Sequence, residues 1–251
     1  MLSISKKSYY YRAVKPLNDG EIKSYLLSLA MEHKRWGFDK MMQKAKNDGK
    51  PWNHKRVYRI YCELKLNLRV KPRKRIPKGE AKALVYPIKP NVCWSIDFMT
   101  DVLQTGQRFR TLNVIDDYNR EALMIEPSYS LPATAVTSLI DKIAMVRGYP
   151  NRIRVDNGPE FIANHFKSWA KQRCVTIDFI QPGKPAQNGF IERFNRIFRE
   201  DILDMYWFNS LLDVRNKARQ WMTKYNTQRP HGSLNGLSPI QFAKFRESKT
   251  S

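Results

Sequence analysis

Two acidic residues with 35 residues between them place the strongest constraint on how this chain can fold. Asp156 follows the alternating run 152–155, which predicts a short strand, and the residues Asn-Gly-Pro at 157–159 end that strand abruptly. Glu192 lies near the start of a segment whose apolar residues recur at helical spacing: Phe190, Phe194, Ile197 and Phe198. The intervening chain is long enough for a helix, a strand and a loop, which can return the second carboxylate to the first.

A third acid, Asp97, stands inside the run Trp-Ser-Ile-Asp-Phe-Met-Thr at 94–100, which otherwise predicts a buried strand. A buried charge needs a partner or a metal, so Asp97 is either one member of an ion pair or a metal ligand. If Asp97, Asp156 and Glu192 converge, their repulsion requires cations, and ligation by oxygen alone favours Mg²⁺ or Mn²⁺. Two such ions activate a water or a 3′-hydroxyl for phosphoryl displacement, which is nuclease or strand-transfer chemistry.

The order of the remaining segments predicts an α/β fold over residues 91–251, in which helices flank a mixed sheet. Strand-like runs at 93–103, 108–116 and 122–128 suggest an antiparallel meander. Helical spacing follows at 136–143, 162–169, 190–198 and 214–225, with strands at 152–155 and 175–180 between the first three of these helices. A proline-containing tail ends the chain.

Residues 1–69 predict a small basic domain of three amphipathic helices, similar to a helix-turn-helix domain. Asn53 is the expected N-cap of the third helix, and Lys55, Arg56 and Arg59 lie off its apolar stripe. These three residues are candidate DNA contacts, although a solvated face on a structural helix explains them as well. Residues 70–90 hold four prolines and seven Lys or Arg, which predicts an extended basic linker that either follows a DNA backbone or serves as a spacer.

The charge distribution supports a polyanionic partner. The net charge is +22, and residues 1–90 hold 23 Lys and Arg against 7 Asp and Glu. Such asymmetry predicts binding to nucleic acid or to an anionic membrane surface. No stretch approaches the ~20 apolar residues of a spanning helix, and no signal peptide is recognisable, so we expect a cytoplasmic, nucleoid-associated protein that does not insert into membranes.

The motifs around the three acids resemble those of the retroviral-integrase-like DDE transposases. Residues 94–98, 155–161, 181–185 and 188–196 carry the resemblance, together with residues 225–234 near the C-terminus. They are most similar to the second reading frame (OrfB) of the IS-three insertion-sequence family, although many members have His-Ser where this chain has Arg154-Val155. The resemblance implies an RNase H-like integrase core with Asp97, Asp156 and Glu192 as its metal-binding triad. It also implies oligomers on paired DNA ends and an upstream-frame protein as fusion or partner.

Six further residues around the Glu192 helix are candidate DNA contacts: Lys184, Gln187, Asn188, Asn195, Arg196 and Arg199. A solvated helix face is the alternative for the charged ones, and a helix N-cap is the alternative for Asn188. Asp116 and Asp117 precede Tyr118 and are interpreted as turn residues outside the triad. His165 falls on an apparently apolar helix face, which predicts a packed, hydrogen-bonded imidazole without a function of its own.

Together these features predict a DNA transposase that cleaves strands at the ends of an insertion sequence and transfers them by 3′-hydroxyl attack, with two bound Mg²⁺ or Mn²⁺ ions. Two alternatives remain open. A non-catalytic DNA-binding regulator of transposition requires the basic N-terminal third but not the triad. A hydrolytic nuclease uses the triad but cuts DNA without joining it.

Overall fold

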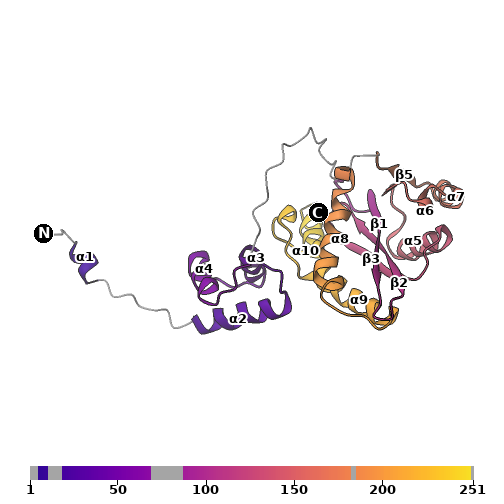
Figure 1. Cartoon of the computed structure of the whole chain (residues 1–251). Coiled ribbons are helices and arrows are strands. Elements are labelled where there is room, and N and C mark those ends of the chain that lie inside the picture. Colours follow the sequence, from indigo (N-terminus) through magenta and orange to yellow (C-terminus); the bar gives the residue numbers. More distant parts are fainter. Residues whose placement is uncertain (1–4, 11–18, 69–86, 182–184, 250–251) are drawn as a thin grey trace. The chain divides into compact units, whose positions relative to one another are not determined.

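The computed structural model describes residues 5–10, 19–68, 87–181 and 185–249. The chain divides into two compact units, Met1–Val70 and Lys71–Ser251 (Figure 1). Most of the predicted linker, residues 70–90, lies outside the described residues, so the domain bounds 1–69, 70–90 and 91–251 stay a prediction. None of the helices in the described ranges has the length and apolar character needed to cross a membrane.

The N-terminal unit is helical, with three longer helices packed around one apolar core. Its helices are α1 (Lys6–Tyr9), α2 (Asp19–Glu32), α3 (Phe38–Asn47) and α4 (His54–Glu63). The core takes Ile22 and Leu26 from α2, Met41 from α3 and Ile60 from α4, all at most 2% exposed. Asn53 caps α4 as predicted, because its side chain accepts a hydrogen bond from the backbone N–H of residue 55.

The second unit is built on a five-stranded mixed sheet in the order β3-β2-β1-β4-β5. The strands are β1 (Cys93–Val102), β2 (Arg108–Asp116), β3 (Ala122–Ser128), β4 (Arg152–Val155) and β5 (Thr176–Phe179). The first three form the predicted antiparallel meander, and β4 and β5 run parallel to β1. The parallel pairing places the carboxyl end of β4 beside the middle of β1, and these are the positions of Asp156 and Asp97.

Helices cover both faces of this sheet (Figure 1), and the sheet separates two apolar cores. One face packs against α5 (Ala133–Arg147), α6 (Pro159–Ile162) and α7 (Asn164–Gln172). The other packs against α8 (Gly189–Phe198), the π-helical turn η2 (Arg199–Leu203) and α9 (Leu211–Thr227). The sheet therefore separates α8, which carries Glu192, from the helices that connect β4 to β5.

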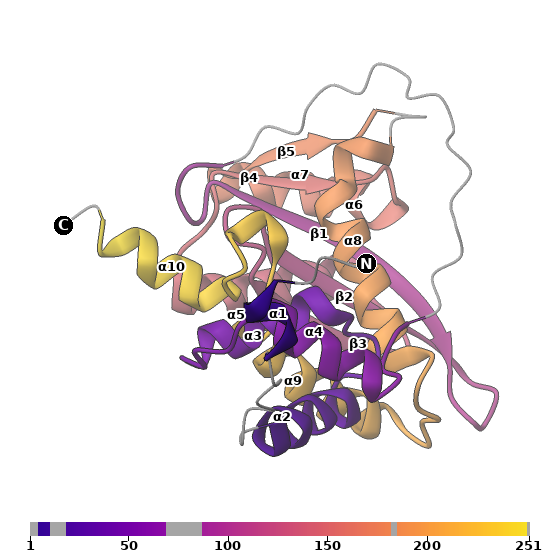
Figure 2. The same cartoon turned by 90° about the vertical axis from the view of Figure 1, so that its left-hand side faces the viewer.

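The C-terminal segment differs from the prediction of a proline-containing tail. The short 3-10 turn η3 (Gly232–Leu234) is followed by α10 (Pro239–Glu247), which contacts α9 and extends to the left in Figure 2. Ser238 and Gln241 form a capping box at its start, and Pro239 occupies its first turn. The sequence contains these start signals, but Pro239 is the only fully buried residue among those of α10, so an apolar stripe does not reveal the helix.

Candidate active site

Asp97 lies in the middle of β1, on the sheet face that packs against α8, and it is partly buried. The backbone N–H of Phe98 donates to Asp97 Oδ1 at 2.8 Å, and Asn195 Nδ2, from α8, donates to Asp97 Oδ2 at 2.8 Å. Asn113 Nδ2, on β2 directly opposite Asp97, donates in turn to Asn195 Oδ1 at 2.7 Å. A chain of two buried amides therefore holds the Asp97 carboxylate in one orientation.

Asp156 follows the last residue of β4 and is exposed. Its Oδ1 accepts a hydrogen bond from the backbone N–H of Gly158 at 3.0 Å. A Cβ atom at Gly158 would lie 2.9 Å from that same oxygen, so a side chain at this position would displace the carboxylate. Asn157 ties the loop to the end of β5, because its Nδ2 donates to the backbone oxygen of Ile180 at 3.0 Å.

Glu192 lies in the first turn of α8, with an exposed side chain. The opposite face of this helix is anchored in the core by Ile191, Phe194 and Phe198, each at most 1% exposed. The apolar periodicity that predicted the helix thus fixes the direction in which Glu192 points.

The three acids interact electrostatically. Burial and the charges of Asp156 and Glu192 raise the pKa of Asp97, whereas hydrogen bonds from Phe98 N–H and Asn195 lower it, and together they bring it to about 6. Among the described residues, no Lys or Arg forms an ion pair with any of the three. Within the part of the chain that the structure describes, the site therefore gathers negative charge without an ion-paired Lys or Arg to balance it.

The chemistry of these donors suits a hard divalent cation, because carboxylate oxygens without nitrogen or sulfur favour Mg²⁺ or Mn²⁺. Within the described ranges, no group of three His, Cys, Asp or Glu side chains is close enough to hold a metal ion as it stands. The three acids thus share an electrostatic site but do not form a closed cage of ligands.

A second contact fixes the loop that carries Asp156 and was not predicted from the sequence. Arg110, on β2, forms an ion pair with Glu160 in α6, and its guanidinium lies 4.1 Å from the centre of the Phe98 ring. Phe98 in turn stacks on Phe161 at 5.2 Å between ring centres. This contact joins the residue after Asp97 to the helix after Asp156. It could not be found from spacing, because Arg110 and Glu160 are 50 residues apart.

In the N-terminal unit, the structure places the three candidate DNA-binding residues of α4 in different surroundings. Lys55 is exposed. Arg56 and Arg59 both pair with Asp19, at the start of α2, at 2.9 Å, and Arg59 also pairs with Glu63. These two cations therefore tie α4 to α2. Their role in DNA binding stays a prediction.

Around α8, the other candidate DNA contacts fall into exposed and buried groups. Arg196 is exposed, and Gln187 bonds to Gln181 across the connection from β5. Arg199 donates to the backbone oxygen of Thr100 at 2.8 Å and pairs with Asp101 at 3.2 Å, which fastens the end of α8 to β1.

Asn188, Asn195 and Lys184 complete this set. Asn188 is only 4% exposed and occupies the N-cap position of α8, but its side chain makes no capping hydrogen bond. Asn195 is 8% exposed and supports Asp97 as described above. Lys184 lies outside the described residues. DNA contact by these residues stays a prediction.

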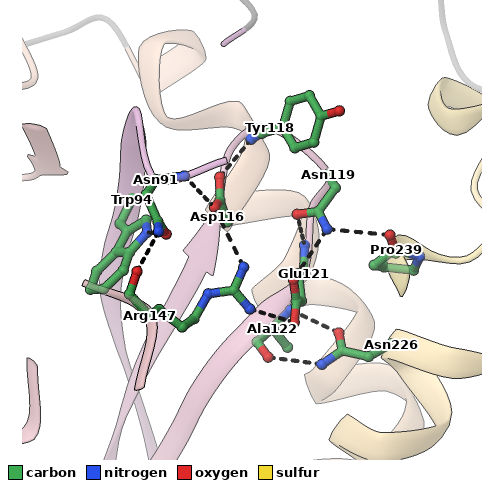
Figure 3. Close-up of polar contacts among 10 residues, drawn as sticks. All are labelled: Asn91, Trp94, Asp116, Tyr118, Asn119, Glu121, Ala122, Arg147, Asn226 and Pro239. Atoms are coloured by element: carbon green, nitrogen blue, oxygen red, sulfur yellow. Dashed lines mark hydrogen bonds and ion pairs between the residues drawn. The ribbon is translucent and has the colours of Figure 1, made fainter. Parts of the chain in front are cut away.

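Asp116 and Asp117 are more than the turn residues that the sequence suggested, because both are completely buried. Asp116 accepts hydrogen bonds from the backbone N–H groups of Asn91 and Tyr118, each at 2.9 Å, and lies 4.0 Å from Arg147 (Figure 3). Figure 3 also shows the neighbouring contact in which Asn226 of α9 bonds to both backbone groups of Ala122 on β3. The turn after β2 is therefore a buried polar centre that connects several elements.

The prediction for His165 was wrong in one respect. Its side chain is exposed at the surface of α7 and not packed within the apolar face, although it does share a hydrogen bond with Thr137 Oγ1 at 3.0 Å. The spacing 162–169 predicted one helix, but Ile162 ends α6 and is 47% exposed, whereas Phe166 and Trp169 belong to α7 and are buried.

Comparison with known proteins agrees with this architecture. Two models described as integrase core domains match residues 87–185 and 173–239, and a model described as an HTH-like domain matches residues 18–75. A relative from Burkholderia multivorans, named insertion element IS407 uncharacterized 31.7 kDa protein, is 38% identical over 97% of this chain and 88% of its own length. The insertion element IS476 uncharacterized 39.2 kDa protein of Xanthomonas euvesicatoria is 35% identical over 97% of this chain and 70% of its own length.

Among solved structures, a chain of the simian T-cell lymphotropic virus intasome in complex with PP2A regulatory subunit B56 gamma has a similar fold. The alignment covers 80% of this chain and 70% of that chain, with a TM-score of 0.51 and 15% identity. The second unit thus has the RNase H-like fold of retroviral integrases, and the N-terminal unit is an HTH-like domain. The chain belongs to the IS-three family of insertion-element transposases, whose integrase core supports a role in DNA transposition.

Proposed function

We propose that the chain is a DDE-type polynucleotidyl transferase, which cleaves strands at insertion-sequence ends and joins them to target DNA. One observation carries the proposal: the parallel register of β4 on β1 brings Asp156 toward Asp97, and α8, which carries Glu192, bonds to Asp97 through Asn195 at 2.8 Å. The charges of Asp156 and Glu192 accordingly both raise the pKa of Asp97. Three carboxylates that act on one another, with no ion-paired Lys or Arg among the described residues, form a site in which divalent cations can supply the positive charge.

In this proposal Asp97, Asp156 and Glu192 are the metal ligands. Two Mg²⁺ or Mn²⁺ ions held by these carboxylates would supply Lewis-acid chemistry, which would activate a water or a 3′-hydroxyl and stabilise the leaving oxygen. The protein supplies orientation. Asn195 and the Phe98 amide hold Asp97, the Gly158 amide holds Asp156, and the buried face of α8 directs Glu192.

DNA contact is assigned to two regions of positive or polar character. In the HTH-like domain, Lys55 is exposed, and Arg56 and Arg59 would exchange Asp19 for phosphate on binding. In the core, Gln187 and Asn188 directly precede the first turn of α8, which holds Glu192, and Arg196 lies one turn further along this helix. Assembly into oligomers on paired ends and cooperation with an upstream-frame protein belong to this proposal, as does action in the cytoplasm on nucleoid DNA.

The test uses labelled insertion-sequence ends and a target duplex with Mg²⁺ or Mn²⁺, scored separately for binding, nicking and joining. We expect the wild type to nick and join, and Asp156→Asn and Glu192→Gln to bind the ends but do neither. Lys142→Gln, a surface change on α5, is the matched control and should leave all three activities unchanged.

The same assay separates the alternatives. Metal-independent binding without nicking, even when the upstream-frame protein is added, would identify a regulator. Nicking without joining would identify a nuclease. Strand joining that persists in Asp156→Asn would exclude the proposed triad.

A further inference from the structure

Strands β1 and β4 separate immediately before the proposed metal ligands. The last position at which they pair is Ser95 opposite Arg154. Asp97 lies two residues after Ser95, and Asp156 lies two residues after Arg154. Because side chains alternate along a strand, each acid lies on the same face of the sheet as the paired residue before it. The separation of the two carboxylates therefore depends on how the strands are held at this last pair.

One side chain bridges both strands at that position. Asp117 Oδ1 accepts a hydrogen bond from Ser95 Oγ at 2.6 Å, and Asp117 Oδ2 accepts one from Arg154 Nη1 at 2.8 Å. The backbone N–H of Asp117 also donates to the carbonyl oxygen of Cys93 at 2.9 Å, which fixes the turn after β2 to the start of β1. Asp117 and Ser95 are both 0% exposed, so water does not compete for these contacts.

Arg154 extends the bridge to the edge of the sheet. Its Nε donates to Asp178 Oδ2 on β5 at 3.2 Å, while its Nη1 is used by Asp117. The Arg154 side chain is only 10% exposed. The charge of Arg154 is therefore balanced by Asp117 and Asp178, which belong to neighbouring elements. This residue has a structural role and is not available to bind a DNA phosphate.

We propose that Asp117 is a positioning residue, which sets the separation of Asp97 and Asp156 by bridging β1 and β4 at their last paired position. The inference rests on the proposed function of the two acids. Asp117 touches neither of them, and it acts through Ser95 and Arg154, the residues two positions before each acid. Loss of the bridge should weaken divalent-cation binding by about tenfold, as changes in the supporting contacts of metal ligands commonly do.

The experiment compares the full-length wild type with Asp117→Asn, Ser95→Ala and Asp201→Asn. Asp201 is the matched control because it also accepts from an arginine, Arg229 Nη1 at 2.8 Å, and from Trp221 Nε1 at 3.1 Å, but it ties η2 to α9 and not β1 to β4. Mn²⁺ affinity is measured by electron paramagnetic resonance without DNA. The Mg²⁺ concentration for half-maximal nicking, DNA-end binding without metal, and the unfolding temperature are measured in parallel.

We expect Asp117→Asn to bind Mn²⁺ about tenfold more weakly and to need correspondingly more Mg²⁺ for nicking, with unchanged DNA-end binding. Ser95→Ala removes one of the two side-chain contacts of Asp117, and we expect its Mn²⁺ affinity to fall and its Mg²⁺ requirement to rise by about threefold. If Asp117→Asn does not fold, Ser95→Ala by itself tests the positioning role. Asp201→Asn should keep the wild-type Mn²⁺ affinity even where its unfolding temperature falls.

Two outcomes would overturn the proposal: wild-type Mn²⁺ affinity in Ser95→Ala and in any folded Asp117→Asn, or an equal loss of affinity in Asp201→Asn. The variant Asp156→Asn distinguishes this failure from failure of the proposed function. If wild-type Mn²⁺ binding does not depend on Asp156, the metal site itself is wrong and the positioning role falls with it. If it does depend on Asp156 but not on Asp117 or Ser95, only the positioning role is wrong.

Discussion

The second unit contains two groups of acidic side chains whose charges are balanced in different ways. Asp116 and Asp117, after β2, are completely buried, and each is matched by backbone amides, a hydroxyl or an arginine. Asp97, Asp156 and Glu192 are more exposed, yet among the described residues no cation pairs with them, and the other two acids raise the pKa of Asp97. By burial, Asp116 and Asp117 are the unusual acids of this unit. By the lack of a balancing cation in the described part of the chain, Asp97, Asp156 and Glu192 are the unusual ones.

This difference separates structure from chemistry. A buried acid whose hydrogen-bonding capacity is filled by the protein contributes to the fold and has little capacity left for a ligand. Acids that repel one another lower the stability of the metal-free protein, and this arrangement is retained where a cation is to be bound. The predictions below test whether the two groups differ in this way.

The largest expected effect is on catalysis. Asp97→Asn should reduce strand nicking and joining by at least about a thousandfold, because it removes one of three proposed ligands. The side chain keeps its shape, so end binding should stay within about twofold of the wild type. Rates with Mg²⁺ and Mn²⁺ are measured on labelled ends. Nicking at a wild-type rate would show that Asp97 has no catalytic role.

Gly158→Ala should have the next largest effect, since the new Cβ would lie 2.9 Å from Asp156 Oδ1 and 3.3 Å from Glu160 Oε2. The carboxylate of Asp156 must move, and we expect nicking to fall about a hundredfold at a fixed Mg²⁺ concentration. Gly20→Ala is the matched control, because a Cβ at that position meets no atom within 4 Å. Equal activity in the two variants would show that the position of Asp156 is not critical.

The sequence predicted the elements of the catalytic unit closely, and the reasons are local. Strands β1 to β5 and helices α5, α8 and α9 show alternation or helical spacing within a few residues of their observed bounds. The three acids could be recognised because each stands at a recognisable place in such an element. Helix α10 was missed because only its capping residues mark it.

The surroundings of the acids could not be predicted in the same way, because their partners are distant in sequence. Asp117 meets Ser95 and Arg154, 22 and 37 residues away, and Asp97 meets Asn195, 98 residues away. No local sequence pattern indicates which of these acids forms an ion pair with an arginine. The assignment of Asp117 to a simple turn therefore followed from its neighbours in sequence, whereas its burial follows from the pairing of β1 with β2 and β4.

The two groups should also differ in the sign of their effect on stability. Asp117→Asn leaves the buried Arg154 with one of its two acids, and breaking such a pair should lower the free energy of unfolding by about 3 kcal/mol. Asp97→Asn should instead raise it by about 1 kcal/mol at pH 7.5 without metal, because it removes a repelling charge while Asn keeps one acceptor oxygen. Denaturant titrations of both variants give the comparison, and a loss of stability in both would remove the distinction.

The smallest effect expected is the pH dependence that Asp97 alone produces. Its pKa is about 6 in the folded protein, above the usual value for aspartate, so the folded state binds a proton more tightly than the unfolded state does. The stability that this proton contributes is therefore complete below pH 4 and is lost as the pH rises through 6.

Without metal, the wild type should accordingly gain about 1 kcal/mol relative to Asp97→Asn as the pH falls from 7.5 to 4.5, which closes the gap between the two. Subtracting one protein's unfolding free energy from the other's at each pH removes the contributions of all other groups that titrate equally in both. Saturating Mg²⁺ should reverse the trend, because a bound cation favours the ionised carboxylate and the proton then competes with it. A difference that does not change across this range would mean that the acids around Asp97 do not act on it, and the contrast with Asp117 would then rest on hydrogen bonding alone.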